Sequence, residues 1–298
     1  MYMARETALH RRRRLALIRG VTDNAFDFTH MCKHKPERIG IVAEGDSWFA
    51  YPRKWIAFGA DVNIVHHIAE KIEGTDQANL LRLASNGDEA VDMTSGKQIK
   101  KLYKILKRNQ KWIRIVLFSG GGNDIVGKND MLPLLNEYLP GMTYLECVNK
   151  ERFDRKIESI LLAYGRLLDL CADVVPQAKV ITHTYDIAKP WDQGAEFFWG
   201  LIKTKPWVHP YMVRRGIPPE LHLPVMEYML RCFGERLIDI ANMPSNSNRL
   251  LVVNTQGTLN PGSNIDWLNE IHPTEKGFKA ITKKIYSGMR KVEPALPT

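Results

Sequence analysis

Cysteines, long apolar runs and linkers are all scarce in this chain of 298 residues. Its four cysteines are far apart and form no Cys-x-x-Cys pair, which argues against a disulfide framework and a cysteine-rich zinc module. No run approaches the ~18 apolar residues that a membrane-spanning helix needs, so an integral membrane protein is excluded. No Pro/Gly/Ser linker and no internal repeat divides the chain, so we expect a single domain over residues 1–298.

The amino terminus also lacks a secretory signal, although basic residues precede an apolar stretch there. Residues 15–18 (Leu-Ala-Leu-Ile) are apolar, but Arg19 follows at once. A secretory signal needs an apolar core of ~7–15 residues. We therefore expect a cytoplasmic protein by default, noting that a leaderless export route would leave no trace in the sequence.

Positive charge is in excess: 42 Lys and Arg against 33 Asp and Glu give a net charge of +9. Much of it lies in a basic amino-terminal arm, residues 1–37, and in residues 97–114, which hold eight basic residues and no acidic one. Apolar residues recur at helical spacing in the second segment, so a solvated helix face explains its lysines. The alternative is attraction to an anionic surface, and the lysine spacing does not choose between phospholipid and nucleic acid. We name an anionic membrane surface as a candidate partner and predict no specific nucleic acid.

Short apolar runs alternate with helical patterns along the chain, which is typical of βαβ units and a parallel sheet. We therefore predict an α/β fold with a five-stranded parallel sheet. The expected strands are 39–47, 79–85, 112–119, 179–185 and 250–255, and the expected helices are 95–108, 152–172, 224–240 and 274–290.

Residues 187–223 interrupt this rhythm with a connection longer than a normal crossover. The segment holds six aromatic residues, Trp191, Phe197, Phe198, Trp199, Trp207 and Tyr211. A long connection with its own aromatic content is typical of a lid or a binding loop. A small satellite core would explain it equally well.

Polar residues follow the predicted strands at the edge of the sheet where ligands bind in such folds. Ser47, Gly87 and Asn123 follow the first three strands, and His272 precedes the last helix. This set suits acyl transfer, with Ser47 as the nucleophile and His272 as its base. The backbone N–H groups of Ser47 and Gly87 and the side-chain amide of Asn123 would form the oxyanion hole.

The blocks Gly45-Asp46-Ser47, Gly87, Gly122-Asn123-Asp124 and His272 resemble, in this order, the four signature blocks of the SGNH hydrolases, the GDSL lipase/esterase superfamily. The resemblance spans residues 39–290. It implies a three-layer α/β/α flavodoxin-like fold, hydrolysis of esters by the serine, no metal and no cofactor.

The chain departs from this pattern at two positions. Trp48 stands where a leucine commonly follows the serine, and Asn269 stands where the last block usually carries the aspartate of Asp-x-x-His. Asn269 could orient His272 through its carbonyl, as the asparagine of Cys-His-Asn proteases does. Asp266 could fold back instead, Glu270 is a more distant candidate, and a Ser-His dyad oriented by a backbone carbonyl is a further alternative.

These observations predict a serine esterase or lipase that cleaves a small-molecule carboxylic ester through an acyl-enzyme intermediate. The aromatic insertion and the basic segment favour a lipid or lysophospholipid substrate. Because aromatic side chains also stack on sugar rings, an O-acetyl carbohydrate esterase is an alternative. A catalytically idle protein that binds through its basic surface is another, since His272 lacks the usual carboxylate.

Overall fold

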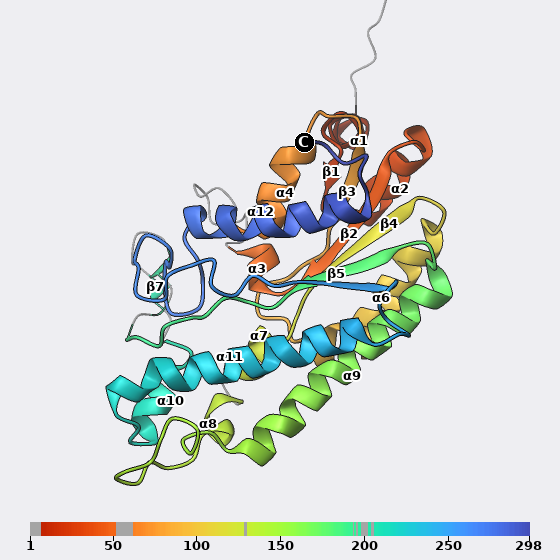
Figure 1. The fold of residues 1–298 in the computed structure, drawn as a ribbon. Helices are drawn as coiled ribbons and strands as arrows, with labels where there is room; N and C mark the ends of the chain where they lie inside the picture. Colours follow the sequence, from red (N-terminus) through yellow and green to blue (C-terminus); the bar gives the residue numbers. More distant parts are fainter. Residues whose placement is uncertain are drawn as a thin grey trace, which may run out of the picture.

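The computed structural model describes residues 7–51, 62–127, 130–192, 194, 196–197, 202–203 and 206–298. Its centre is a parallel sheet of six strands in the order β1-β3-β2-β4-β5-β8, with helices on both faces (Figure 1). The predicted three-layer α/β fold is therefore confirmed. The strands are β1 (Val21–Thr22), β2 (Ile39–Gly45), β3 (Ala78–Arg82), β4 (Ile113–Ser119), β5 (Lys179–His183) and β8 (Leu250–Val253).

The sixth strand corrects the prediction of a five-stranded sheet. β1 lies at one edge and pairs in parallel with β3, Val21 opposite Leu80 and Thr22 opposite Leu81. Both of its residues are buried. Two residues are too few to show the alternating or continuously apolar pattern by which strands are recognised. Tertiary packing therefore creates a strand that the sequence pattern does not reveal.

The helices cover the sheet in two layers. In Figure 1, α4 and α12 lie over one face, and α6, α9 and α11 lie over the other. Their bounds are α4 (Ile64–Ile72), α12 (Glu275–Val292), α6 (Gly96–Arg108), α9 (Lys150–Val174) and α11 (Pro219–Asn242). Short helices follow strands or join these layers: α3 (Ser47–Ala50), α5 (Ala90–Met93), α7 (Gly122–Val126), α8 (Met131–Leu134) and α10 (His209–Arg214). Among the described residues, no helix combines the length and apolarity needed to cross a membrane.

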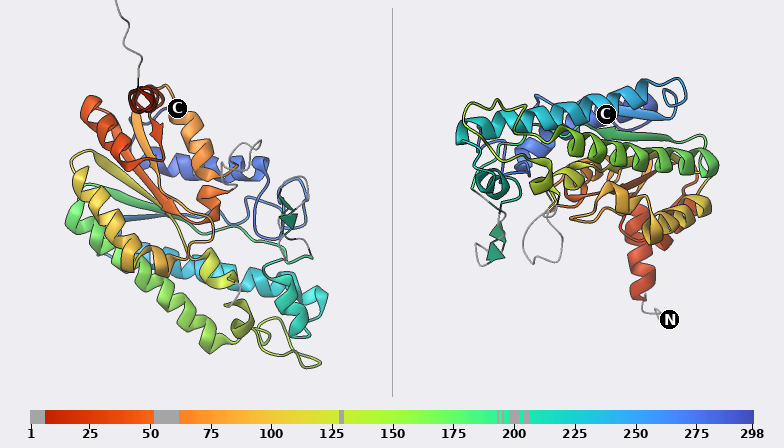
Figure 2. Two further views of the ribbon diagram at one scale, coloured as in Figure 1. Left: turned by 180° about the vertical axis from the view of Figure 1, so that it is seen from behind. Right: turned by 90° about the horizontal axis from the view of Figure 1, so that it is seen from below.

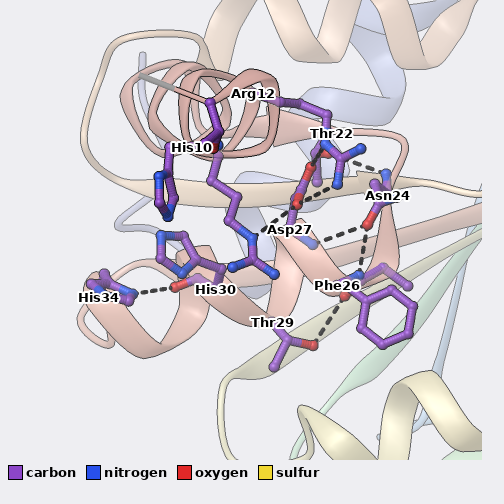
Figure 3. Close-up of polar contacts among 12 residues, drawn as sticks. His10, Arg12, Thr22, Asn24, Phe26, Asp27, Thr29, His30 and His34 are labelled. Carbon is purple, nitrogen blue, oxygen red and sulfur yellow. Dashed lines mark hydrogen bonds and ion pairs between the residues drawn. The ribbon is translucent and has the colours of Figure 1, made fainter. Parts of the chain in front are cut away.

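The basic arm folds as two helices, α1 (Ala8–Arg19) and α2 (Ala25–His34), which pack on one another beside β1 and β3. Arg12 holds them together, because its guanidinium donates to both carboxylate oxygens of Asp27, with Nε 2.5 Å from Oδ2 and Nη2 3.1 Å from Oδ1 (Figure 3). Asn24 caps α2 by accepting from the N–H of Phe26 at 2.9 Å. The carboxylate of Asp27 is fully buried, so the pair ties α1 to α2, and α2 in turn packs against β3.

The aromatic insertion is described in part. It contains α10 and two short antiparallel strands, β6 (Glu196–Phe197) and β7 (Ile202–Lys203). Phe198 and Trp199 lie outside the described residues, so their predicted role in a lid stays a prediction.

Candidate active site

The nucleophile candidate Ser47 is the first residue of α3, directly beyond the carboxyl end of β2. Asp46 caps this short helix, since its Oδ1 accepts from the N–H of Trp48 at 3.0 Å. The Trp48 indole N–H donates to the backbone carbonyl of Ile271 at 3.1 Å. The first bond fixes the turn that carries Ser47, and the second ties this turn to the loop that carries His272.

Ser47, His272 and Asn269 form one hydrogen-bonded row. His272 Nε2 lies 2.9 Å from Ser47 Oγ, and His272 Nδ1 lies 3.0 Å from Asn269 Oδ1. The same Asn269 oxygen accepts from the backbone N–H of His272 at 3.0 Å and of Ile271 at 3.2 Å. An oxygen acceptor on Nδ1 requires the hydrogen there, which leaves Nε2 as an acceptor facing the serine hydroxyl.

The other two candidates for orienting the histidine are engaged elsewhere. The Asp266 carboxylate accepts from the backbone N–H of Asn260 at 3.0 Å. The Glu270 carboxylate accepts the backbone N–H groups of Trp207, Val208 and His209, the last two at 2.8 and 2.6 Å. Burial raises the pKa of Glu270 to about 7. Of these three side chains, the structure brings only Asn269 onto the imidazole, and Glu270 instead holds the aromatic insertion beside it.

The imidazole of His272 is enclosed by aromatic rings. Tyr51 stacks on it with ring centroids 4.1 Å apart, and Trp207 approaches with its edge at 5.4 Å. Burial lowers the pKa of His272 to about 3 because it disfavours the charged imidazolium. The ring is therefore neutral near pH 7 and able to take a proton from Ser47.

Two of the three predicted oxyanion-hole residues line one pocket. Ser47 and Asn123 face it together, whereas Gly87 is not among its lining residues. The Asn123 amide donates one hydrogen to the backbone carbonyl of Asp88 at 2.9 Å. An amide has two hydrogens, so the other is available to a substrate oxygen. Gly87 lies two residues after Ser85 in the loop beyond β3 with φ +88°, a conformation that favours glycine.

The pocket itself is small and mostly apolar, with a volume of about 30 Å³. Met226 and Leu230 of α11 line it together with the polar residues Ser47 and Asn123. Its lining residues are Asp46, Ser47, Trp48, Gly122, Asn123, Val126, Tyr185, Asp186, Ala188, Met226, Leu230 and Ile271. An apolar wall beside a serine is suited to the acyl part of an ester.

A buried polar chain, which no motif in the sequence indicates, supports the turn that carries Ser47. His183 Nδ1 accepts from the N–H of Tyr185, so Nε2 carries hydrogen and donates to Ser119 Oγ at 3.0 Å. Ser119 donates on to Asp46 at 2.8 Å, and the Tyr185 hydroxyl donates to the same carboxylate. Burial raises the pKa of Asp46 to about 7 and lowers that of His183 to about 3. Tyr185 has φ +53°, which no sequence signal reveals.

One cluster of side chains in the described part of the chain could hold a metal ion. His66, His67 and Glu70 of α4 place their ligand atoms within 4.8 Å of one another. Glu70 already pairs with both imidazoles, at 3.5 and 2.8 Å. None of the three lines the pocket at Ser47, so this cluster lies outside the candidate active site.

No protein-family model and no curated protein sequence matches this chain. Solved structures do match. The lipase Lip_vut3 from a goat rumen metagenome superposes with a TM-score of 0.53 at 13% identity, over 86% of this chain and 97% of that one. An extracellular lipase from Streptomyces rimosus gives 0.48 at 16% identity, over 87% and 99%. A carbohydrate esterase of family 3 from Talaromyces cellulolyticus gives 0.44 at 12% identity, over 86% and 99%. The chain thus shares its fold with the lipase Lip_vut3.

Proposed function

We propose that this chain is a serine hydrolase that cleaves a carboxylic ester through an acyl-enzyme intermediate. The observation that carries the proposal is the buried row of Ser47 Oγ, His272 and Asn269 Oδ1, joined at 2.9 and 3.0 Å. A hydroxyl on a neutral imidazole, with that imidazole oriented by a third group, is the arrangement that activates serine as a nucleophile.

The reaction follows from this geometry. Ser47 Oγ attacks the ester carbonyl while His272 Nε2 takes the hydroxyl proton, and His272 Nδ1 keeps its hydrogen, which it donates to Asn269 Oδ1. The Ser47 N–H, the Asn123 amide and the Gly87 N–H would stabilise the oxyanion. Collapse expels the alcohol, which takes the proton from Nε2 and leaves the acyl group on Ser47. A water molecule then attacks the acyl-enzyme, Nε2 takes its proton, and Ser47 recovers that proton as the acid leaves.

The apolar lining of the pocket supports an aliphatic acyl group, such as that of a lipid or lysophospholipid. The small volume of the pocket favours a second candidate. A water molecule needs about 10–15 Å³, so about 30 Å³ is room for roughly two to three groups of that size, which favours a short acyl group such as acetyl. An O-acetyl carbohydrate esterase needs room for an acetyl group only, so the pocket volume is compatible with that activity.

The test is hydrolysis of p-nitrophenyl esters from acetate to palmitate by the wild type and by Ser47→Ala, with fluorophosphonate labelling and peptide mapping. We expect turnover that Ser47→Ala abolishes and a label on Ser47. Preference for acetate would favour the carbohydrate esterase, and preference for longer chains the lipid enzyme. A folded wild type that neither turns over any ester nor takes the label would refute the proposal and leave a non-catalytic binding protein.

A further inference from the structure

The side chain of Tyr185 reaches across the carboxyl edge of the sheet, from the end of β5 to the end of β2. Tyr185 lies two residues after β5 and is buried. Its hydroxyl donates to Oδ2 of Asp46, the residue before Ser47, and lies 3.2 Å from the Oγ of Ser119 at the end of β4. Because β4 stands between β2 and β5 in the sheet, this one phenol joins the ends of three neighbouring strands.

The ring of Tyr185 also packs against Gly122, the residue before Asn123. A Cβ at position 122 would lie 2.8 Å from the Cε1 atom of the ring and 3.1 Å from Cζ, so only a glycine fits there unless the ring moves. Tyr185 therefore contacts both turns that carry the predicted oxyanion donors, the turn before Ser47 through its hydroxyl and the turn before Asn123 through its ring. All of these residues line the same pocket.

Tyr185 occupies this place in a strained backbone conformation. Its φ of +53° lies in the left-handed region, which costs free energy for any residue with a Cβ. Its surroundings hold it there: the backbone N–H donates to His183 Nδ1 at 3.3 Å, and the ring lies 4.6 Å from that of His183 and 5.0 Å from that of Trp48, measured between centroids. Such strain persists only where packing and hydrogen bonds fix a residue, and it is found mostly at functional sites.

We propose that Tyr185 is a positioning residue of the oxyanion hole, which sets the distance between the Ser47 N–H and the Asn123 amide. This role rests on the proposed ester hydrolysis and deepens it. Two donors stabilise an oxyanion only when both point at the place where the charge develops, and a small displacement of either is costly. Because one rigid ring holds both turns, the spacing of the donors is fixed before substrate binds.

The test compares Tyr185→Phe with Tyr286→Phe in the hydrolysis of p-nitrophenyl acetate. Tyr185→Phe keeps the ring and removes the bond to Asp46, so we expect kcat to fall by about tenfold to a hundredfold with KM nearly unchanged. Affinity for a boronic acid should fall by the same factor as kcat/KM. In that complex boron bonds to Ser47 Oγ while His272 takes the proton, which gives an anionic tetrahedral adduct like the reaction intermediate.

Tyr286→Phe is the matched control for the loss of a buried hydroxyl. Tyr185 and Tyr286 are both 4% exposed, and the Tyr286 hydroxyl donates to the carbonyl of Pro297 at 3.0 Å. Tyr286 belongs to α12, which lies across the sheet from the pocket-lining helix α11 (Figure 2, left). This variant should lower the melting temperature and leave kcat and the boronic acid affinity as they are.

A second variant, Gly122→Ala, tests the contact with the ring and decides the matter if Tyr185→Phe does not fold. Its methyl group must push the ring and the turn before Asn123 apart, so kcat and boronic acid affinity should again fall together. The inference is overturned if an active wild type and both variants share the same kcat and boronic acid affinity, or if Tyr286→Phe loses as much as Tyr185→Phe. A change in acyl-chain preference alone would also overturn it, making Tyr185 only a wall of the pocket. A wild type that hydrolyses no ester and binds no boronic acid would refute the proposed function itself, and this role with it.

Discussion

The phenol ring of Tyr51 lies flat on the imidazole of His272, with planes only 12° from parallel. Both rings are buried. This stack removes one face of the imidazole from water, and desolvation is the cause that lowers the pKa of His272 to about 3. The base of the proposed reaction is thus kept in its neutral form with the help of a residue that does not line the pocket.

The first prediction concerns pH. Because His272 works only when it is neutral and its pKa lies near 3, kcat/KM should stay level from about pH 8 down to about pH 5. Tyr51→Ser admits water to the ring and raises this pKa, so activity should begin to fall at a higher pH. A wild type whose kcat/KM halves near pH 6.5, the ordinary histidine value, would contradict the buried imidazole.

The second prediction concerns Asn269. Asn269→Ala removes the acceptor for His272 Nδ1–H, and we expect kcat to fall by about two to four orders of magnitude because the tautomer is no longer fixed. Asn269→Asp restores a carboxylate, stabilises the imidazolium and moves the acid limb of the pH profile upward. Asp266→Asn serves as the control and should leave kcat unchanged, because that carboxylate bonds to Asn260 instead. Equal losses of kcat in Asn269→Ala and Asp266→Asn would show that the orienting role does not belong to Asn269 alone.

The third prediction concerns Gly87 and distinguishes the effect of backbone strain on stability from the loss of an oxyanion donor. Alanine at Gly87 has open space for its Cβ but must adopt φ +88°, which costs about 1–3 kcal/mol and displaces the N–H. Gly74→Ala is the matched control, with φ +75° and equally open space. Both variants should melt at a lower temperature, but only Gly87→Ala should lose kcat. If the two keep equal activity, the Gly87 N–H is not an oxyanion donor.

The fourth prediction concerns the pocket wall. Met226 and Met229 are both buried on α11, but only Met226 lines the pocket beside Ser47. Each change to alanine should destabilise the protein by about 2–5 kcal/mol. Met226→Ala should also shift the preferred p-nitrophenyl ester to a longer acyl chain, whereas Met229→Ala should not. An unchanged profile in Met226→Ala would place the acyl group elsewhere.

Much of this molecule was predictable because its strands are buried on both faces. Runs such as 39–45 and 113–119 are mostly apolar and almost entirely buried, and the residues that follow them fall at the edge where ligands bind. The Ser47 to His272 juxtaposition follows from that rule. β1 was not predicted, because two residues are too few to show a periodic pattern of apolar side chains. The buried polar chain from His183 to Asp46 was not predicted either, because it joins residues of three strands whose relative positions are set only by the fold.

The bond from the Trp48 indole to Ile271 spans 223 residues, and the Ser47 to His272 pair closes a loop of 225. Contacts of such separation carry a large loop-closure entropy, which other contacts must offset. Ser47 and His272 therefore meet only when distant parts of the sequence come together. A partly folded chain holds Ser47 without His272 beside it, so we expect it to lack the proposed hydrolase activity.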